Sequence, residues 1–258
     1  MTVWITGASS GIGEACAYEY AAQGAGLLLT ASRADRLEAV ASECLRRGAR
    51  AACVLPYDLQ DPEGIPGLCS KAWEMSGGID ILFCNAGVSQ RTKVEDTSME
   101  MIRKIMEINY FAPVAICKEL LPRMTASGHG KIAVTTSIAG RFGFPLRCGY
   151  SSSKFALYGF FETLAAEQDV IDVTIVCPGR VNTNISMNAL VEGGARYGKM
   201  DPGQAGGLDS AKAARKIVRA ISKGKREVLV GRKELLMVYI KRFFPGLCSK
   251  LAKNLKPV

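Results

Sequence analysis

The sequence predicts an α/β fold in which about seven parallel strands form one doubly wound sheet with helices on both faces. Two observations lead to this prediction. Short apolar runs alternate with longer stretches of helical periodicity along the chain, as in repeated strand–helix–strand units. The apolar runs are continuous and not interleaved with polar residues, which indicates strands that are buried on both faces.

The elements follow one another in a regular order. The expected strands are TVWIT (2–6), GLLLTA (26–31), AACVLP (51–56), IDILFCN (79–85), KIAVTTS (131–137), VTIVCP (173–178) and EVLVG (227–231). Helices are expected near 12–23, 34–47, 61–76, 98–126, 150–168 and 210–223. Because the chain shows no repeat, linker or low-complexity segment, we interpret residues 1–231 as one domain and 232–258 as its C-terminal extension.

Composition excludes several classes of protein. A hydrophobic content of 48% and a mean hydropathy of +0.11 are typical of a globular chain, and no apolar run is long enough to span a bilayer. The N-terminus lacks the basic and apolar regions of a signal peptide, so we expect a cytoplasmic protein. The nine cysteines are odd in number and lack a CxxC pair, which favours reduced thiols over disulfides or a metal site. The single histidine, His129, is expected in a loop, which argues against a Ser-His-Asp triad.

The net charge of +9 is concentrated near the C-terminus. Residues 211–258 hold 14 Lys and Arg but only 2 Asp and Glu, whereas residues 1–210 hold 19 and 22. The basic character is therefore local, and together with the lack of an aromatic and basic platform it argues against nucleic-acid binding.

A glycine-rich turn, TGASSGIG (6–13), follows the first strand and opens the first helix. Glycines 7, 11 and 13 allow a tight turn and a close backbone approach, and the helix N-terminus offers free N–H groups to a phosphate. At the first strand-to-helix turn of a parallel sheet, this pattern predicts a dinucleotide site of the Rossmann type.

The GxxxGxG spacing resembles that of the short-chain dehydrogenase/reductase family. Further marks of that family follow in order over residues 2–231: Asp58 after the third strand, CNAG (84–87), Asn109, Ser137, a YxxxK pair at Tyr150 and Lys154, and PGRVNT (178–183). Cys84 departs from the family, which has Asn at this position.

The resemblance implies catalytic roles for Asn109, Ser137, Tyr150 and Lys154. Tyr150 would exchange a proton with a carbonyl or alcohol oxygen, and Ser137 would hold that oxygen. Lys154, four residues further on the same helix face, would lower the pKa of Tyr150 and bind the nicotinamide ribose. Asn109 would fix a water beside Lys154. The same resemblance implies the cofactor contacts, at Gly7, Ser9, Ser10, Gly11, Ile12, Gly13, Ser32, Arg33, Asp58, Leu59, Asn85, Ala86, Gly87, Tyr150, Lys154, Pro178, Gly179, Val181 and Thr183.

The end of the second strand favours NADP(H) over NAD(H). No carboxylate occupies residues 30–33 to bind a ribose 2′-hydroxyl, whereas Ser32 and Arg33 are placed to bind a 2′-phosphate. The alternative is that Arg33 is only solvated at the start of a helix and that Arg36, or neither, contacts the phosphate.

A glycine-rich stretch at about 184–207 stands where this family has its substrate lid. An apolar substrate pocket is expected between Met187, Leu190 and Val191 on one side and Phe142, Phe144 and Pro145 on the other. Through TNISMNAL and ARYGKMD the chain also resembles the acyl-dihydroxyacetone-phosphate reductase branch, which implies an acyl-bearing ketone from lipid metabolism. Arg141, Arg147, Arg180, Arg196 and Lys199 are candidates for contacting a phosphate or an acyl carrier.

The tail from Lys233 to Val258 mixes apolar residues with six lysines and arginines. We favour a segment that closes the acyl pocket or packs on a second subunit; the alternative is a basic amphipathic segment on an anionic membrane. Helices 98–126 and 150–168 are the elements through which the family forms homodimers or homotetramers.

The predicted activity is that of a carbonyl reductase, or of the reverse alcohol oxidation, without a metal. Two alternatives remain: a 3-oxoacyl-thioester reductase, and a non-catalytic cofactor-sensing protein on the same fold.

Overall fold

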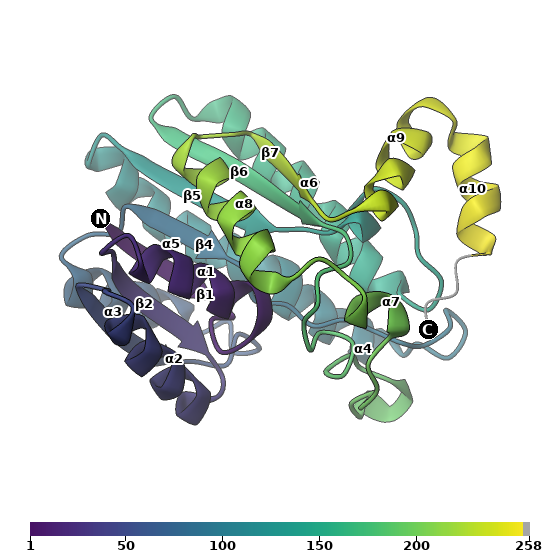
Figure 1. The fold of residues 1–258 in the computed structure, drawn as a ribbon, viewed down its shortest axis with the longest axis horizontal. Coiled ribbons are helices and arrows are strands. Elements are labelled where there is room, and N and C mark those ends of the chain that lie inside the picture. The colour runs from purple at the N-terminus through teal and green to yellow at the C-terminus, as the bar shows by residue number, and fades with distance from the viewer. Residues whose placement is uncertain (255–258) are drawn as a thin grey trace.

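Seven parallel strands form one sheet in the computed structural model, which describes residues 1–254 (Figure 1). The strands are β1 (Thr2–Thr6), β2 (Gly26–Ala31), β3 (Ala51–Pro56), β4 (Ile81–Cys84), β5 (Gly130–Thr135), β6 (Ile171–Pro178) and β7 (Glu227–Val230). Their spatial order is β3-β2-β1-β4-β5-β6-β7. This confirms the predicted doubly wound sheet, in which the strand order reverses between β1 and β4.

Helices follow the strands along the whole chain. They are α1 (Gly11–Ala21), α2 (Ala34–Arg46), α3 (Ile65–Ser76), α4 (Met99–Met106), α5 (Ala112–Ala126), α6 (Cys148–Glu167), α7 (Pro202–Ala205), α8 (Ser210–Ser222), α9 (Leu236–Phe243) and α10 (Pro245–Lys253). All connections between paired strands run over a face of the sheet, because both strands of each pair point the same way.

The strand side chains divide between two hydrophobic layers. Trp4 and Leu82 point to the layer that α3, α5 and α6 cover, whereas Ile5 and Phe83 point to the layer under α1, α2 and α8. All four side chains are fully buried. Successive residues of a strand face opposite sides, so a strand that is covered on both faces must be apolar throughout, as the sequence suggested.

The long helix expected over 98–126 is interrupted by a π-helical segment, Glu107–Phe111, between α4 and α5. Within it the Ala112 amide donates to the Glu107 carbonyl, five residues back. Pro113 supplies a physical reason, because it has no amide hydrogen to donate to the carbonyl of Asn109. The prediction of one uninterrupted α-helix over 98–126 was therefore wrong. π-helical segments of this kind are frequent at functional sites.

The nine cysteines are all free thiols, seven of them buried. Burial raises the pKa of the Cys69 and Cys117 thiols to about 12. These groups are therefore neutral at physiological pH and serve as small apolar side chains. His129 lies exposed in the turn before β5, where its ring contacts Asp80.

Candidate active site

A cleft of about 500 Å³ opens at the carboxyl ends of the strands. The residues that line it include one at or just beyond the end of each of five strands: Gly7 after β1, Ser32 after β2, Asp58 after β3, Asn85 after β4 and Thr135 as the last residue of β5. The cleft thus straddles the point where the strand order reverses, which is where ligands bind in doubly wound sheets.

The glycine-rich turn is packed backbone against backbone. Gly7 and Gly11 have φ angles of +66° and +65°, which favour glycine. A β-carbon on Gly13 would lie 2.3 Å from the Gly7 carbonyl oxygen, and one on Gly7 would lie 2.7 Å from the α-carbon of Ala86. Side chains at Gly7 and Gly13 would therefore push α1 and the 85–87 loop away from the cleft.

Asn85 ties the ends of three strands together. Its amide nitrogen donates to the Thr6 carbonyl at 3.3 Å and to the Gly7 carbonyl at 3.4 Å, and its oxygen accepts from the Thr135 hydroxyl at 3.1 Å. The Thr6 hydroxyl in turn accepts the backbone amides of Asn85 and Ala86. This network fixes the floor of the cleft between β1, β4 and β5.

The residues that line the cleft fit a nicotinamide dinucleotide. At the start of α1, the Ser10 side chain makes no capping bond to any described residue, so the first amides of the helix remain available to a phosphate. The turn formed by Gly7, Gly11 and Gly13, called here the glycine cradle, has no side chains that would keep the phosphates away from the backbone. Ser32 and Arg33 line the same cleft where an adenosine ribose would lie, and both are exposed.

Tyr150 and Lys154 lie one turn apart on α6, at the inner end of the cleft. Both are buried, with 6% and 3% of their surface exposed. The Lys154 ammonium lies 5.8 Å from the centre of the Tyr150 ring and donates at 2.8 Å to the Thr135 carbonyl. The strand end thus directs the Lys154 amine into the cleft beside the Tyr150 ring.

Burial dominates the titration of both groups. It raises the pKa of the Tyr150 phenol, although the Ser137 hydroxyl and the charges of Arg147 and Arg91 act in the opposite direction. It also lowers the pKa of the Lys154 ammonium to about 7. The expected lowering of the Tyr150 pKa by Lys154 is therefore not found in the protein alone: the charges that act in that direction are those of Arg147 and Arg91, and burial outweighs them.

Asn109 lies in the π-helical segment and is fully buried. Its side chain accepts from the Val88 amide at 2.8 Å and donates at 3.0 Å both to the Val88 carbonyl and to the Ser153 hydroxyl. A β-carbon on Gly87 would lie 3.2 Å from the Asn109 oxygen and 3.4 Å from the Lys154 nitrogen. Asn109 and Lys154 therefore meet around Gly87, although Asn109 does not itself line the cleft.

Ser137 follows β5 and begins a short 3₁₀ turn, Ile138–Gly140. Its hydroxyl accepts a hydrogen bond from the Ala139 amide at 3.1 Å. A hydrogen bond between the same hydroxyl and the Tyr150 phenol acts to lower the pKa of that phenol. Only 8% of Ser137 is exposed.

Gln90, which sequence reasoning missed, helps to place helix α6. Its side chain is fully buried, and its oxygen accepts hydrogen bonds from the backbone amides of Gly149 at 2.9 Å and Tyr150 at 3.3 Å, in the first turn of that helix.

The structure places most, but not all, of the predicted cofactor residues on the cleft. Those on its surface are Gly7, Ser9, Ser10, Gly11, Ile12, Ser32, Arg33, Asp58, Leu59, Asn85, Ala86, Gly87, Tyr150, Lys154 and Thr183. Four predicted residues are not on its surface, namely Gly13, Pro178, Gly179 and Val181. Gly13 packs behind the turn, and Val181 is buried in the layer under α8.

Sequence reasoning also missed part of the lining. The additional residues are Ala31, Tyr57, Gln60, Val88, Lys104, Ile108, Thr135, Thr136, Asn184, Ile185, Asn188 and Gly194, together with Leu190 and Arg196, which were expected only as substrate contacts. Most of them belong to loops after strands or to the segment 184–207. Their position after a strand was a usable signal, but their orientation depends on the loop conformation.

The segment 184–207 is fastened to the loop after β4. Backbone hydrogen bonds of 2.8 Å join Leu190 to Ser89 and to Arg91. Gly193, Gly194 and Gly198 have positive φ angles, which allow the segment to reverse direction. The predicted lid is therefore folded against the body, and Leu190 packs with Met101 and Ile105 beside Val88.

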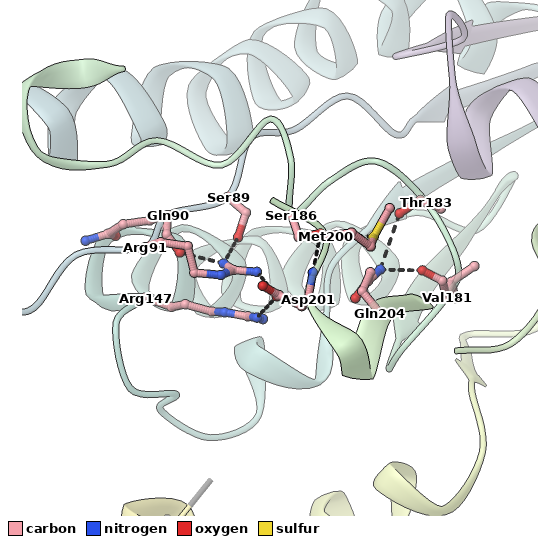
Figure 2. Close-up of polar contacts among 10 residues, drawn as sticks. All are labelled: Ser89, Gln90, Arg91, Arg147, Val181, Thr183, Ser186, Met200, Asp201 and Gln204. Carbon is pink, nitrogen blue, oxygen red and sulfur yellow. Dashed lines mark hydrogen bonds and ion pairs between the residues drawn. The ribbon is translucent and has the colours of Figure 1, made fainter. Parts of the chain in front are cut away.

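A buried ion cluster holds the other end of this segment (Figure 2). Arg91 and Arg147 both donate to the same carboxylate oxygen of Asp201, the second at 3.3 Å. Beside it, the Ser186 hydroxyl accepts the Asp201 amide at 3.3 Å. The cluster joins three chain segments behind the cleft, and it carries two positive charges against one negative charge.

Two parts of the expected substrate pocket were wrong. Phe142 is buried in the hydrophobic core, 5.0 Å from the ring of Phe144, and neither they nor Pro145 line the cleft. Phe144 instead lies under the guanidinium of Arg147. As far as residue 254, the tail contributes no residue to the cleft either.

Comparison with known proteins agrees with this geometry. The family model described as short chain dehydrogenase matches residues 1–192. The chain is 38% identical to the bovine (Bos taurus) dehydrogenase/reductase SDR family member 7B, covering 96% of this chain and 79% of that protein. It is 41% identical to dehydrogenase/reductase SDR family protein 7-like of Anopheles gambiae, covering 88% and 74%.

Solved structures share the fold. An alcohol dehydrogenase from the archaeon Thermococcus sibiricus, complexed with 5-hydroxy-NADP, superposes with a TM-score of 0.77 at 28% identity, covering 90% of this chain and 96% of that one. A short chain dehydrogenase/reductase from Burkholderia phymatum, in complex with NAD, gives a TM-score of 0.83 at 21% identity over 100% and 96%. The second likeness concerns the fold alone.

Proposed function

The chain belongs to the short-chain dehydrogenase family, and from this premise we propose that it is an NADP(H)-dependent oxidoreductase that reduces a ketone or oxidises a secondary alcohol. The observation that carries the proposal is the buried group at the inner end of the cleft. There Tyr150 and Lys154 line a site that fits a dinucleotide, and the buried Ser137 side chain hydrogen-bonds the Tyr150 phenol from behind. Such an arrangement can stabilise charge on one oxygen atom.

Tyr150 is the proton donor in the direction of reduction. Its hydroxyl would give a proton to the substrate oxygen, while the Ser137 hydroxyl donates a hydrogen bond to that oxygen. When bound, the nicotinamide supplies or accepts the hydride. The raised pKa of Tyr150 keeps the phenol protonated in the protein alone, which is the form that reduction requires.

Lys154 returns the proton to Tyr150 through the surrounding polar groups. With a pKa of about 7, its amine is partly protonated at neutral pH and can hold or release a proton at Nζ. The Thr135 carbonyl fixes the amine, and the adjacent Asn109 side chain continues the polar path toward the 88–90 loop. The same amine would hold the ribose of the cofactor.

The 2′-phosphate of NADP(H) would be bound by Ser32 and Arg33. Arg33 occupies the N-cap position of α2 without making a side-chain capping bond to the helix, and it lines the cleft, where its planar guanidinium suits a phosphate. Asp35, the first carboxylate after β2, lies exposed on α2 and is not among the residues that line the cleft. The site therefore offers a cation, and no acid, where the two cofactors differ.

The substrate is an apolar or acyl-bearing ketone. Val88, Ile108, Ile185 and Leu190 give part of the cleft an apolar lining, which an acyl chain would cover. Arg196, from the lid, also lines the cleft and could meet a polar head of the same substrate.

The test is to measure NADPH and NADH oxidation by the purified protein with a panel of ketones. The panel would contain an acyl-dihydroxyacetone phosphate, a 3-oxoacyl thioester, a steroid and an aromatic diketone. Turnover that requires NADPH and is lost in Tyr150→Phe, while NADPH still binds, supports the proposal. Tight NADPH binding without turnover on any ketone would favour a cofactor-sensing protein instead.

A further inference from the structure

The last two helices form a hairpin that stands away from the sheet (Figure 1). Helices α9 and α10 lie against each other and are joined at Phe244. Met237, Val238 and Ile240 pack against the core layer under α6, and Cys248 is buried. The hairpin is therefore anchored on one side, and its orientation relative to the body is fixed.

The other side of the hairpin exposes large apolar side chains. Among residues 1–254, fifteen large apolar side chains are exposed, and six of them lie here: Leu236, Tyr239, Phe243, Phe244, Leu247 and Leu251. Residues 236, 239 and 243 recur at the spacing of one helix face, as do 247 and 251. Phe243 and Phe244, at the turn, are 68% and 64% exposed. Such a concentration of exposed apolar surface marks an interaction site.

The charge around this surface has one sign. Lys241, Arg242, Lys250 and Lys253 lie on the hairpin, and residues 236–254 contain no Asp or Glu. The partner must therefore accept aromatic rings and also carry negative charge. The interface of a bilayer with anionic lipids combines both properties.

A second copy of the chain fits this surface poorly. In a two-fold symmetric contact the same patch faces itself, so the four cations would meet four cations. Like charges in an interface cost free energy, and the hairpin has no acid to offset them. A duplex nucleic acid would match the cations, but it offers no apolar surface to the exposed phenylalanines or to Leu236, Leu247 and Leu251.

The lengths of the helices bear on how the hairpin could contact a bilayer. Among residues 1–254, no helix is long and apolar enough to cross a bilayer. We propose that the α9–α10 hairpin binds the surface of a membrane containing anionic lipids, with Phe243 and Phe244 entering the headgroup region and the four cations above them. This interaction is independent of the catalytic site, because no hairpin residue lines the cleft.

Flotation of the full chain with vesicles tests the proposal. The protein should float with vesicles of phosphatidylcholine and phosphatidylserine, and much less with phosphatidylcholine alone. The double variant Phe243→Ser with Phe244→Ser should bind more than about tenfold more weakly. Lys241→Ala with Arg242→Ala should bind roughly thirtyfold more weakly at low salt.

Matched controls lie on other helices, α2 and α8. Leu45→Ser removes an exposed apolar side chain from α2, and Lys212→Ala with Arg215→Ala removes two exposed cations from α8. Both controls should float like the wild type. A Phe243→Trp variant should gain a fluorescence signal that brominated lipid quenches, since Trp4 is fully buried and Trp73 lies on α3.

The proposal is overturned if the wild type does not float with anionic vesicles, or if the double phenylalanine variant floats equally well. It is also overturned if that variant changes only the oligomeric state on size exclusion, since the hairpin would then be a subunit contact. Should the double variant fail to fold, the quenching result decides alone: absence of quenching would reject insertion of the turn.

Discussion

The Lys154 amine donates a 2.8 Å hydrogen bond to the carbonyl of Thr135, the last residue of β5. The amine is thus held by the sheet and not by the tyrosine one turn earlier on its own helix. Because the carbonyl carries only a partial charge, it does not offset the cost of burying an ammonium group, and the pKa of Lys154 falls to about 7.

Lys154→Met should therefore change how stability depends on pH. The folded pKa of about 7 lies below the ordinary value of 10.5, so between these values the unfolded chain binds more protons than the folded chain. The wild type then gains stability as pH rises through this window, and the variant lacks that gain. Unfolding of the cofactor-free proteins should show a difference of about 2–3 kcal/mol between about pH 6 and about pH 9. Parallel pH profiles would contradict the lowered pKa.

Gly13→Ala should disrupt the phosphate turn. The new β-carbon would fall 2.3 Å from the Gly7 carbonyl oxygen and 2.6 Å from the Asn85 amide nitrogen, so the turn or α1 must move. We expect a loss of about 1–3 kcal/mol in the free energy of unfolding and a marked loss of NADPH affinity. Gly67→Ala on α3 is the control, because its β-carbon meets nothing within 4 Å and should stabilise the helix by about 0.5–1 kcal/mol. Denaturant unfolding and NADPH fluorescence titration measure both effects; normal NADPH affinity in Gly13→Ala would refute the cradle.

The fold could be predicted from the sequence because each strand, helix and turn is indicated by a pattern within its own few residues. Continuous apolar runs such as those of β1 and β4 identify buried strands, and the glycine turn identifies the first crossover. The π-helical segment was missed although Pro113 offered a signal: a proline inside an apparent helix frees the carbonyl four residues before it. The spacing of apolar residues alone does not reveal that one helical turn contains an additional residue, as a π-helical turn does.

The site was harder to predict where its contacts join distant segments. Arg91 and Asp201 are 110 residues apart in sequence, and nothing in either neighbourhood indicates the pair. Phe142 and Phe144 follow Ser137 closely, which made a pocket wall plausible, but the 3₁₀ turn after Ser137 directs Phe142 into the core. Sequence proximity to a catalytic residue therefore did not imply a place in the cleft.

Arg33→Asp should shift cofactor preference toward NADH. The change removes a charged partner of the 2′-phosphate and supplies an acceptor for a ribose hydroxyl, so NADPH should bind about 10- to 100-fold more weakly. Folding should be retained, because Arg33 occupies the N-cap of α2 and Asp is a favourable residue there. Arg36→Asp changes the net charge equally on an exposed position away from the cleft and should have little effect. Equal loss of NADPH affinity in both variants would indicate a general charge effect.

Asp201→Asn should loosen the lid without unfolding the sheet. Asp201 is the common partner of Arg91 and Arg147, so the variant leaves two buried guanidinium groups without their counter-charge (Figure 2). Removing one partner of a buried ion pair typically costs about 3–5 kcal/mol. The segment 184–207 can relieve that cost by detaching locally, since it forms no part of the central sheet. Trypsin should then cleave faster after Arg196 and Lys199, both exposed in the lid, and KM for the ketone should rise more than kcat falls. Asp96→Asn, which removes the same charge from an exposed position in the neighbouring loop, should be cleaved at the wild-type rate. Wild-type cleavage in Asp201→Asn would mean that the backbone bonds between Leu190 and the loop after β4 hold the lid by themselves.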